Sequence, residues 1–247
     1  METQKGVALS NIMRHVAHIH TEFPEKFGIP RQSGVVAELK GKIVFEPEFR
    51  NPDMIRGLED FSHLWIIWQF SQNLDADGNA KWSPTVRPPR LGGNARLGVF
   101  ATRSPFRPNP IGLSVVTIDR IEPDTPEGPV IHVKGADMVD GTPIYDIKPY
   151  IPYADSIPEA KGGFIDSMEY KTLKVVWKCE KNISENIYDS LNKLLSNDPR
   201  PHYQNDPERI YGMSYAGYNV KFRVIDEEVI VLGIEKQTMF KRKQERS

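Results

Sequence analysis

The spacing of apolar residues predicts short strands rather than helices in the first part of the chain. Runs of apolar and β-branched residues alternate with turn residues at short intervals, a pattern typical of β-strands. The expected strands are 16–23, 35–38, 42–45, 60–70, 97–102, 111–121, 130–134 and 144–147, with a single helical turn at 52–58. Because no helical periodicity separates these runs, they predict an antiparallel barrel or sandwich instead of βαβ units.

The run at 60–70, DFSHLWIIWQF, is the strongest strand candidate. Its nearly continuous series of aromatic and β-branched residues predicts a strand that is buried on both faces. No GxGxxG sequence joins a strand to a helix, which argues against a doubly wound nucleotide-binding fold. The first part of the chain is therefore predicted to be mainly β and not a Rossmann fold.

The second part of the chain has a different pattern, which predicts a smaller α+β domain. Residues 150–163 are rich in proline and glycine and form a predicted linker. Ser184 is a candidate N-cap for a helix over 185–195. Further strands are expected at 173–179, 217–224 and 228–235. The resulting division gives domains at 15–155 and 165–236 and a basic tail at 237–247.

The composition limits the classes of protein that the chain can represent. A chain of 247 residues can bury a substantial core. The single cysteine, Cys179, excludes an internal disulfide framework and a zinc site built from cysteines. No apolar run is long enough to span a bilayer, and the first residues lack the pattern of a signal peptide. A cytoplasmic protein is therefore expected, without a membrane partner.

One segment, residues 81–114, combines positive charge with rigid, irregular backbone. No Asp or Glu occurs from Lys81 to Thr117, although the formal net charge of the whole chain is −1. The arginines of the segment are Arg87, Arg90, Arg96, Arg103 and Arg107. Prolines and glycines around them prevent a helix. Fixed guanidinium groups suit an anionic ligand such as phosphate, and the alternative is a set of solvated loop arginines.

Three histidines near the start of the chain raise the question of a metal site. His18 and His20 lie two residues apart and would point to the same face of a strand. A metal-dependent hydrolase using His15, His18 or His20 is one alternative function. No further cluster of His, Asp or Glu supports it, so no metal is expected.

Four sequence motifs together resemble the TrmO family, also called YaeB or TsaA-like. The motifs are residues 84–114 with RSPFRPNPIGLS, the PRQ at 30–32, the DMVDGTP at 137–143 and the DPRPxY at 198–203. The resemblance implies an S-adenosylmethionine-dependent tRNA methyltransferase that acts on N6 of N6-threonylcarbamoyladenosine at position 37. It also implies that 15–155 is a β-barrel that binds S-adenosylmethionine, and that the protein is a homodimer.

The resemblance also implies which residues bind the cofactor. They are Pro30, Arg31, Gln32, Ser71, Gln72, Arg103, Leu113, Asp137, Met138, Val139 and Asp140. Arginines can pair with the carboxylate of the cofactor, and the glutamines offer both donors and acceptors. Ser71 departs from the pattern of some relatives, which have a histidine there. The alternative for Asp137 and Asp140 is a turn that caps its own backbone.

The tRNA would be bound by arginines and aromatic residues. The candidates for this role are Arg87, Arg90, Arg96, Arg107, Arg200 and Tyr203, with Trp82 or Phe106 for stacking. Two of these residues have a structural alternative, since Arg107 could brace its loop by pairing with an acid and Arg200 could brace the DPRPxY loop.

Removal of the N6 proton would benefit from a base. The candidates for the base are Asp137, Asp140, Asp146, Tyr203 and the carboxylate of the substrate itself, and the sequence does not choose among them. A non-catalytic module that binds S-adenosylmethionine or RNA remains the alternative to an enzyme.

Overall fold

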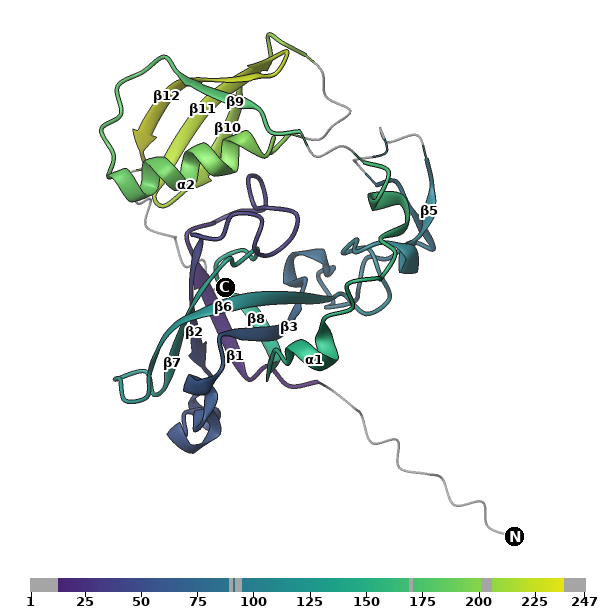
Figure 1. Cartoon of the computed structure of the whole chain (residues 1–247), viewed down its shortest axis with the longest axis vertical. Helices are drawn as coiled ribbons and strands as arrows, with labels where there is room; N and C mark the ends of the chain where they lie inside the picture. Colours follow the sequence, from purple (N-terminus) through teal and green to yellow (C-terminus); the bar gives the residue numbers. More distant parts are fainter. Residues whose placement is uncertain (1–12, 89–90, 92–94, 169–170, 201–205, 238–247) are drawn as a thin grey trace.

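The computed structural model describes residues 13–88, 91, 95–168, 171–200 and 206–237. Figure 1 shows two bodies, a barrel and, above it, a sheet crossed by one helix. The predicted basic tail lies outside the described residues apart from Gln237, and so do the candidate residues Arg90 and Tyr203. The described residues contain no helix that is both long and apolar enough to cross a membrane.

In the described part of the chain, six antiparallel strands close into a barrel in the order β1-β2-β7-β6-β3-β8. The barrel strands are β1 (Ala17–Thr21), β2 (Lys40–Phe45), β3 (His63–Gln69), β6 (Ile111–Glu122), β7 (Val130–Lys134) and β8 (Thr142–Pro149). The predicted antiparallel barrel is confirmed. Its core is made by inward-facing residues such as Ile19, Ile43, Ile66 and Ile131, all fully buried, which is the alternation expected of a small barrel.

Strand β3 is buried on one face only. Leu64, Ile66 and Trp68 point into the barrel, whereas Trp65 and Ile67 between them are half-buried. The predicted burial on both faces is wrong, because in the described part of the chain β3 belongs to an antiparallel barrel, whose outer face can stay open to solvent, unlike the two covered faces of a parallel sheet. Its outer side chains instead remain accessible on the barrel wall, and Trp65 forms part of the cleft described below.

The glycine in the IGLS sequence of β6 lets a tryptophan pack against the backbone. Trp68 lies directly opposite Gly112 in the register of β3 and β6. A Cβ atom at position 112 would lie only 2.2 Å from the Trp68 ring, so any larger residue would displace the ring. The next two residues then point to opposite sides, Leu113 outward and Ser114 into the barrel.

The C-terminal domain is a four-stranded sheet with one helix, whereas the sequence predicted one helix and three strands. Its strands follow the order β10-β11-β12-β9, and the last pair is parallel. The elements are β9 (Lys174–Trp177), α2 (Glu185–Ser196), β10 (Tyr211–Tyr215), β11 (Tyr218–Ile225) and β12 (Glu228–Lys236). Helix α2 buries Leu191, Leu194 and Leu195. Ser184 precedes it as predicted, although its side chain makes no capping hydrogen bond.

The loop between β1 and β2 belongs structurally to both domains. Phe23, Val36 and Leu39 leave the barrel and are buried in the core of the C-terminal domain. Figure 1 shows this loop between the barrel and the C-terminal sheet with α2. The strand predicted at 35–38 is wrong, since the segment is a turn. Its apolar residues serve the core of the second domain rather than the wall of the barrel.

The described residues between 81 and 110 project from the barrel as an irregular lobe (Figure 1), and 111–114 begin the barrel strand β6. The strand predicted at 97–102 is reduced to β5 (Leu97–Gly98), which pairs with β4 (Thr85–Val86). Asn73 ties the lobe to the end of β3, because its buried amide donates to the carbonyls of Lys81 and Pro105, both at 2.8 Å.

The remaining described helices are short. They are η1 (Pro47–Phe49), η2 (Pro52–Ile55), η3 (Leu58–Asp60), η4 (Ser71–Asn73), η6 (Val99–Ala101), α1 (Pro152–Asp155) and η7 (Gly163–Ile165). The helical turn expected at 52–58 therefore appears as η2 and the start of η3. The predicted linker at 150–163 contains the unpredicted helix α1.

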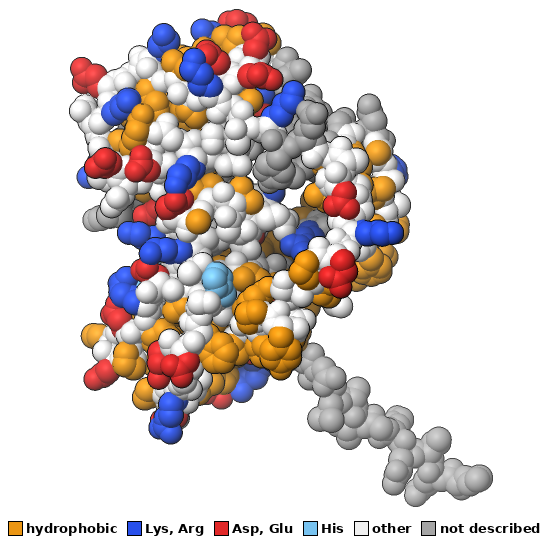
Figure 2. Space-filling model, viewed as in Figure 1, with side chains coloured by type: hydrophobic (Ala, Val, Ile, Leu, Met, Phe, Trp, Pro, Cys, Tyr) orange, Lys and Arg blue, Asp and Glu red, His pale blue; other side chains and the backbone are white. Residues whose placement is uncertain are grey.

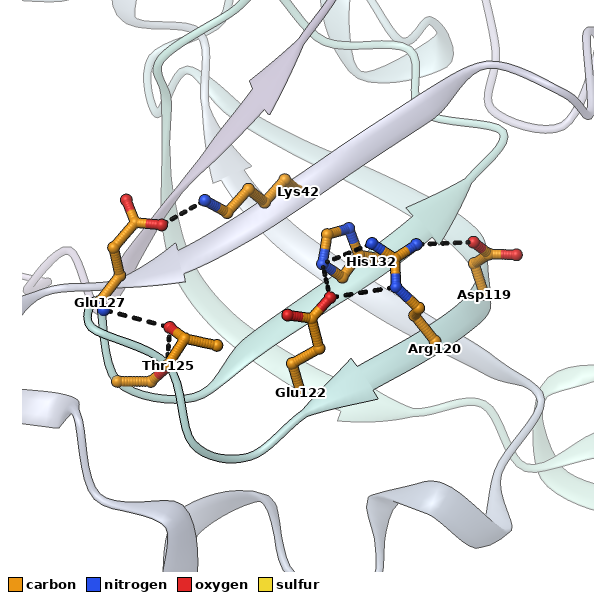
Figure 3. A network of polar contacts seen from close by, with 8 residues as sticks. Lys42, Asp119, Arg120, Glu122, Thr125, Glu127 and His132 are labelled. Atoms are coloured by element: carbon orange, nitrogen blue, oxygen red, sulfur yellow. Dashed lines mark hydrogen bonds and ion pairs between the residues drawn. The ribbon is translucent and has the colours of Figure 1, made fainter.

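The outer face of β2, β6 and β7 carries exposed ion pairs, so that positive and negative side chains lie close together there (Figure 3). Glu122 accepts from Arg120 at 3.1 Å and lies 2.8 Å from His132, while Lys42 pairs with Glu127. Exposed pairs of this kind contribute little to stability. They also balance the charge of this face, which distinguishes it from the arginine-bearing lobe.

Candidate functional site

A cleft of about 460 Å³ opens on the outer wall of the barrel. Its lining residues are Ser33, His63, Trp65, Arg103, Leu113, Val115, Tyr150 and Asp155. Strands β3 and β6 supply the apolar floor through outward-facing residues. The β1–β2 loop supplies Ser33 and the lobe supplies Arg103 at the polar end, and the segment from the end of β8 to α1 supplies the other end.

Three of the predicted cofactor-binding residues meet at the polar end of this cleft. Arg103 donates a hydrogen bond to the side-chain oxygen of Gln32. Leu113 is 52% exposed on the floor beside Arg103. Ser33, which follows Gln32 directly, joins them by accepting a 3.2 Å hydrogen bond from the backbone of Val115. Segments from three distant parts of the sequence therefore form one wall.

Asp137 is the candidate base with the most unusual environment. Its carboxylate accepts a 2.7 Å hydrogen bond from the Ser114 hydroxyl and is also hydrogen-bonded by the backbone of Ser33. Surrounding protein atoms desolvate the ionised form, and this burial raises the pKa of Asp137 to about 6. Part of the residue stays accessible to solvent. A carboxylate with this pKa can accept a proton near neutral pH.

The other residues of the DMVDGTP sequence are committed to the barrel. Met138 is buried in the core, and its carbonyl accepts a 2.9 Å hydrogen bond from Thr21. The Asp140 carboxylate lies 3.2 Å from Nδ1 of His20 and accepts a 3.1 Å hydrogen bond from the backbone N–H of Thr21. The carbonyl of Val139 accepts from Thr142. The Asp140 carboxylate therefore binds the backbone of β1 rather than that of its own turn, which differs from the capping alternative, and Asp137 faces a different set of partners.

Two other predicted cofactor residues lie apart from the polar end of the cleft. Ser71 and Gln72 form most of η4 at the end of β3, and neither lines the cleft. Arg31 is exposed and donates to the backbone carbonyl of Arg200 at 3.1 Å, so its guanidinium reaches the C-terminal domain. Asp146 pairs with Lys148 at 3.2 Å on the outer side of β8.

The described tRNA candidates of the lobe fall into two groups. Arg87 and Arg96 are exposed, as are Trp82 at 59% and Phe106 at 48%. Arg107 instead braces the lobe by donating to two backbone carbonyls, at 3.1 and 3.2 Å. It is a brace, but its partners are carbonyls rather than the acid considered as an alternative.

Arg200 occupies a structural position that differs from the predicted phosphate contact. It is only 7% exposed, and its guanidinium forms a two-pronged pair with Asp198 at 2.9 and 3.0 Å. A paired and buried guanidinium has little capacity left for phosphate. The bracing alternative therefore fits the described part of the DPRPxY sequence.

The histidines near the chain start do not form a metal centre with other described residues. His18 pairs with Glu46, and His20 lies near Asp140. Across the described residues, no group of three or more His, Cys, Asp or Glu side chains could hold a metal ion. This part of the chain offers no donor set for the metal-dependent hydrolase.

Several site residues were not predicted from the sequence. His63, Trp65 and Tyr150 form an aromatic end of the cleft, with ring centroids 5.9 Å apart for Trp65 and Tyr150 and 6.2 Å apart for His63 and Tyr150. The outward orientation of His63 and Trp65 could have been inferred from the alternation along β3, whereas Tyr150 follows β8. Ser33 and Ser114 adjoin predicted motifs, and only the fold reveals that both contact Asp137.

The closed barrel, whose outer wall carries a cleft with an arginine–amide pair near a desolvated carboxylate, defines a β-barrel protein outside the Rossmann class. The family profile described as tRNA-methyltransferase O N-terminal domain matches residues 18–156, and that of the TrmO C-terminal domain matches 168–237. The chain belongs to the TrmO family. This confirms the predicted resemblance.

Individual relatives agree with this assignment. The chain is 40% identical over 227 residues to the tRNA (adenine(37)-N6)-methyltransferase of Escherichia coli strain K12, covering 88% of this chain and 94% of that protein. It is 33% identical over 180 residues to a probable S-adenosyl-L-methionine-binding protein of Pyrococcus abyssi, covering 72% and 85%. The crystal structure of TrmO from Pseudomonas aeruginosa superposes with a TM-score of 0.70 at 29% identity, covering 92% and 100%.

Proposed function

We propose that this protein is an S-adenosylmethionine-dependent tRNA methyltransferase that methylates N6 of N6-threonylcarbamoyladenosine at position 37. The proposal rests on membership of the TrmO family. The observation that carries it is the position of Asp137, whose raised pKa suits a base. The backbone of Ser33 hydrogen-bonds the Asp137 carboxylate, and Ser33 lines the polar end of the cleft. The product is the N6-methylated form of the same nucleoside.

The residues at the polar end fit the cofactor in size and chemistry. A volume of about 460 Å³ lies in the range of small-molecule sites. Arg103 offers a cation for the cofactor carboxylate, Gln32 offers an amide, and Leu113 offers an apolar surface for the adenine. S-adenosylmethionine bound there would supply an electrophilic methyl group and, when its S–CH3 bond breaks, would leave as S-adenosylhomocysteine. The remaining predicted cofactor contacts, including Pro30 and the 71–72 pair, stay part of the proposal.

Asp137 then acts as the general base. The N6 nitrogen belongs to a urea-like group and is a weak nucleophile, so loss of its proton as the new N–C bond forms lowers the barrier. The proton passes to a carboxylate oxygen of Asp137. Ser114 and the backbone of Ser33 hold this carboxylate in one orientation, which limits the cost of alignment at the moment of reaction.

The aromatic end of the cleft suits the target base. Trp65 and Tyr150 present half-buried rings next to the proposed cofactor-binding end, and stacking on aromatic rings is the usual way that proteins hold an unpaired RNA base. Arg87 and Arg96 on the lobe provide phosphate contacts, with Trp82 as a further stacking surface. The molecule works as a cytoplasmic homodimer in this proposal.

The main alternative is a protein that binds S-adenosylmethionine or RNA without catalysis. Transfer of a radiolabelled methyl group from the cofactor to purified tRNA distinguishes the two functions. The enzyme predicts label in tRNA that increases with time and exceeds the amount of protein present. Saturable cofactor binding without label in tRNA would favour the binding module and contradict the proposal.

A further inference from the structure

The loop that carries the PRQ sequence makes several contacts with the C-terminal domain as well as with the barrel. The backbone of Ala216 donates to the carbonyl of Glu22 at 3.0 Å. Phe27 stacks on Phe222 with ring centroids 6.4 Å apart. Gly28 lies so close to the Met213 side chain that a Cβ atom would be 2.3 Å from its sulfur. The second domain thus helps to hold this loop of the barrel domain in place.

The DPRPxY sequence of the C-terminal domain contacts the PRQ sequence directly. Arg31 donates to the backbone carbonyl of Arg200 at 3.1 Å. That carbonyl is held in place because the side chain of Arg200 is buried and pairs with Asp198 through two hydrogen bonds. Asp198 also accepts from the backbone N–H of Arg200 at 3.2 Å. The backbone of Asp198 itself has a φ of +47°, a conformation that few non-glycine residues adopt.

The turn that carries the buried pair lies at the end of helix α2. Asp198 directly follows the C-cap residue of α2 and adopts a left-handed backbone conformation, which Asp tolerates better than most residues and which commonly ends a helix. A buried ion pair costs desolvation and is weak support for stability alone. The turn directs the carbonyl of Arg200 at Arg31, one residue from Gln32.

We propose that the Asp198–Arg200 pair is a positioning device for the cofactor loop. The pair fixes the Arg200 carbonyl, the carbonyl fixes Arg31, and Arg31 fixes the adjacent Gln32, whose side chain accepts from Arg103 in the cleft. The second domain therefore controls the affinity of a site on the first domain. This inference rests on the proposed function, since it takes Gln32 and Arg103 to bind the cofactor.

A double-mutant cycle tests this chain of contacts. We expect Asp198→Asn and Arg31→Met each to weaken S-adenosylmethionine binding by about tenfold, measured by titration calorimetry, and the double variant to be no weaker than Arg31→Met alone. Arg31→Met changes an exposed residue, so it tests the chain even if Asp198→Asn does not fold. Glu235→Gln is the matched control, because it removes an exposed carboxylate that pairs with Lys221 on the same domain.

Hydrogen exchange of the loop provides a readout that needs no ligand. Residues 24–34 are expected to exchange faster in Asp198→Asn than in the wild type, while the control exchanges at the wild-type rate. Unchanged exchange, or additive effects of the two substitutions on cofactor affinity, would overturn the positioning role. A wild-type protein that binds no cofactor but shows the exchange effect would contradict the proposed function and leave the loop anchor standing.

Discussion

The hydroxyl of Ser114 donates a 2.7 Å hydrogen bond to the Asp137 carboxylate and at the same time accepts a 3.0 Å hydrogen bond from the indole of Trp68. Trp68 is in the core of the barrel and is held against Gly112. The orientation of the candidate base is therefore set by the packing of the barrel itself. A site on rigid strands of this kind is better preorganised than a site on loops alone.

Replacing the candidate base should remove most of the activity. Asp137→Asn keeps an oxygen acceptor for Ser114 but cannot take a proton, so we expect methylation to fall by about 10²- to 10⁴-fold. In the wild type, the single-turnover rate should fall as the pH drops through about 6, the pKa of Asp137. A rate that does not change between pH 5 and pH 8, measured at saturating concentrations of tRNA and cofactor, would exclude Asp137 as the base.

The same substitution should not destabilise the protein at neutral pH. The folded-state pKa of Asp137 is raised from 3.8 to about 6, so its ionised form costs up to about 3 kcal/mol of folding free energy above pH 6. The wild type regains this free energy as the pH falls from 7 to 4. We expect the Tm of Asp137→Asn to equal or exceed that of the wild type at pH 8, and this advantage to shrink at pH 5.

A single methyl group at position 112 should disturb both stability and the site. Gly112→Ala places a Cβ atom 2.2 Å from the buried Trp68 ring, and such overpacking costs about 1–3 kcal/mol. This corresponds to a decrease in Tm of about 2–4 °C per kcal/mol in a protein of this size. Gly98→Ala is the control, because the space around that glycine is open. A Tm equal to that of the wild type would contradict the packing described for β6.

The aromatic end of the cleft should affect tRNA more than the cofactor. Trp65→Ala removes a stacking surface worth about 1–3 kcal/mol per base, so the KM for tRNA should rise by roughly tenfold or more. The affinity for S-adenosylmethionine, measured separately by calorimetry, should change little. Equal losses in both would show that Trp65 supports the cleft as a whole and not the target base.

The lobe arginines should determine how binding depends on salt. Arg96→Gln removes one exposed cation of the lobe, so the slope of log Kd against log salt concentration for tRNA should decrease by about one. Arg120→Gln changes an arginine that already pairs with Asp119 and Glu122 on the barrel, and it should leave the slope unaltered. Equal slopes for the wild type and Arg96→Gln would show that tRNA does not bind at this arginine of the lobe.

The hydrophobic pattern predicted most of the barrel strands, but it did not predict which core the neighbouring segments join. The strands at 111–121 and 130–134 were predicted almost to the residue, because their apolar runs are bounded by clear turns. The segment at 35–38 was mistaken for a barrel strand, since a buried valine has the same signature whichever core contains it. Strand β10, YGMSY, was missed because its alternation is interrupted by a glycine and a serine.

Local sequence also left part of the site undetermined. The PRQ and RSPFRPNPIGLS motifs indicated Gln32, Arg103 and Leu113, which the fold brings to one cleft. The choice among the acidic candidates depended on desolvation of Asp137, a property of three-dimensional burial that no spacing encodes. The pairing of Arg200 with Asp198 likewise needed coordinates, because an arginine in a proline-rich loop reads the same whether buried or exposed.

The surface of the C-terminal domain differs from that of the barrel. Figure 2 shows side chains of both charges spread over the C-terminal domain, while hydrophobic side chains gather over the lower part of the barrel. Exposed apolar residues such as Tyr153 at 91% and Ile157 at 61% follow β8, close to the aromatic end of the cleft in the sequence.

The most direct test of the account is the identity of the nucleoside that is methylated. Purified protein and S-adenosylmethionine would be given two tRNA pools, one carrying N6-threonylcarbamoyladenosine and one lacking it, and the digested nucleosides would be separated by mass spectrometry. The account predicts a single added methyl group on that nucleoside, in the first pool only. Methylation of tRNA that lacks the threonylcarbamoyl group would contradict it.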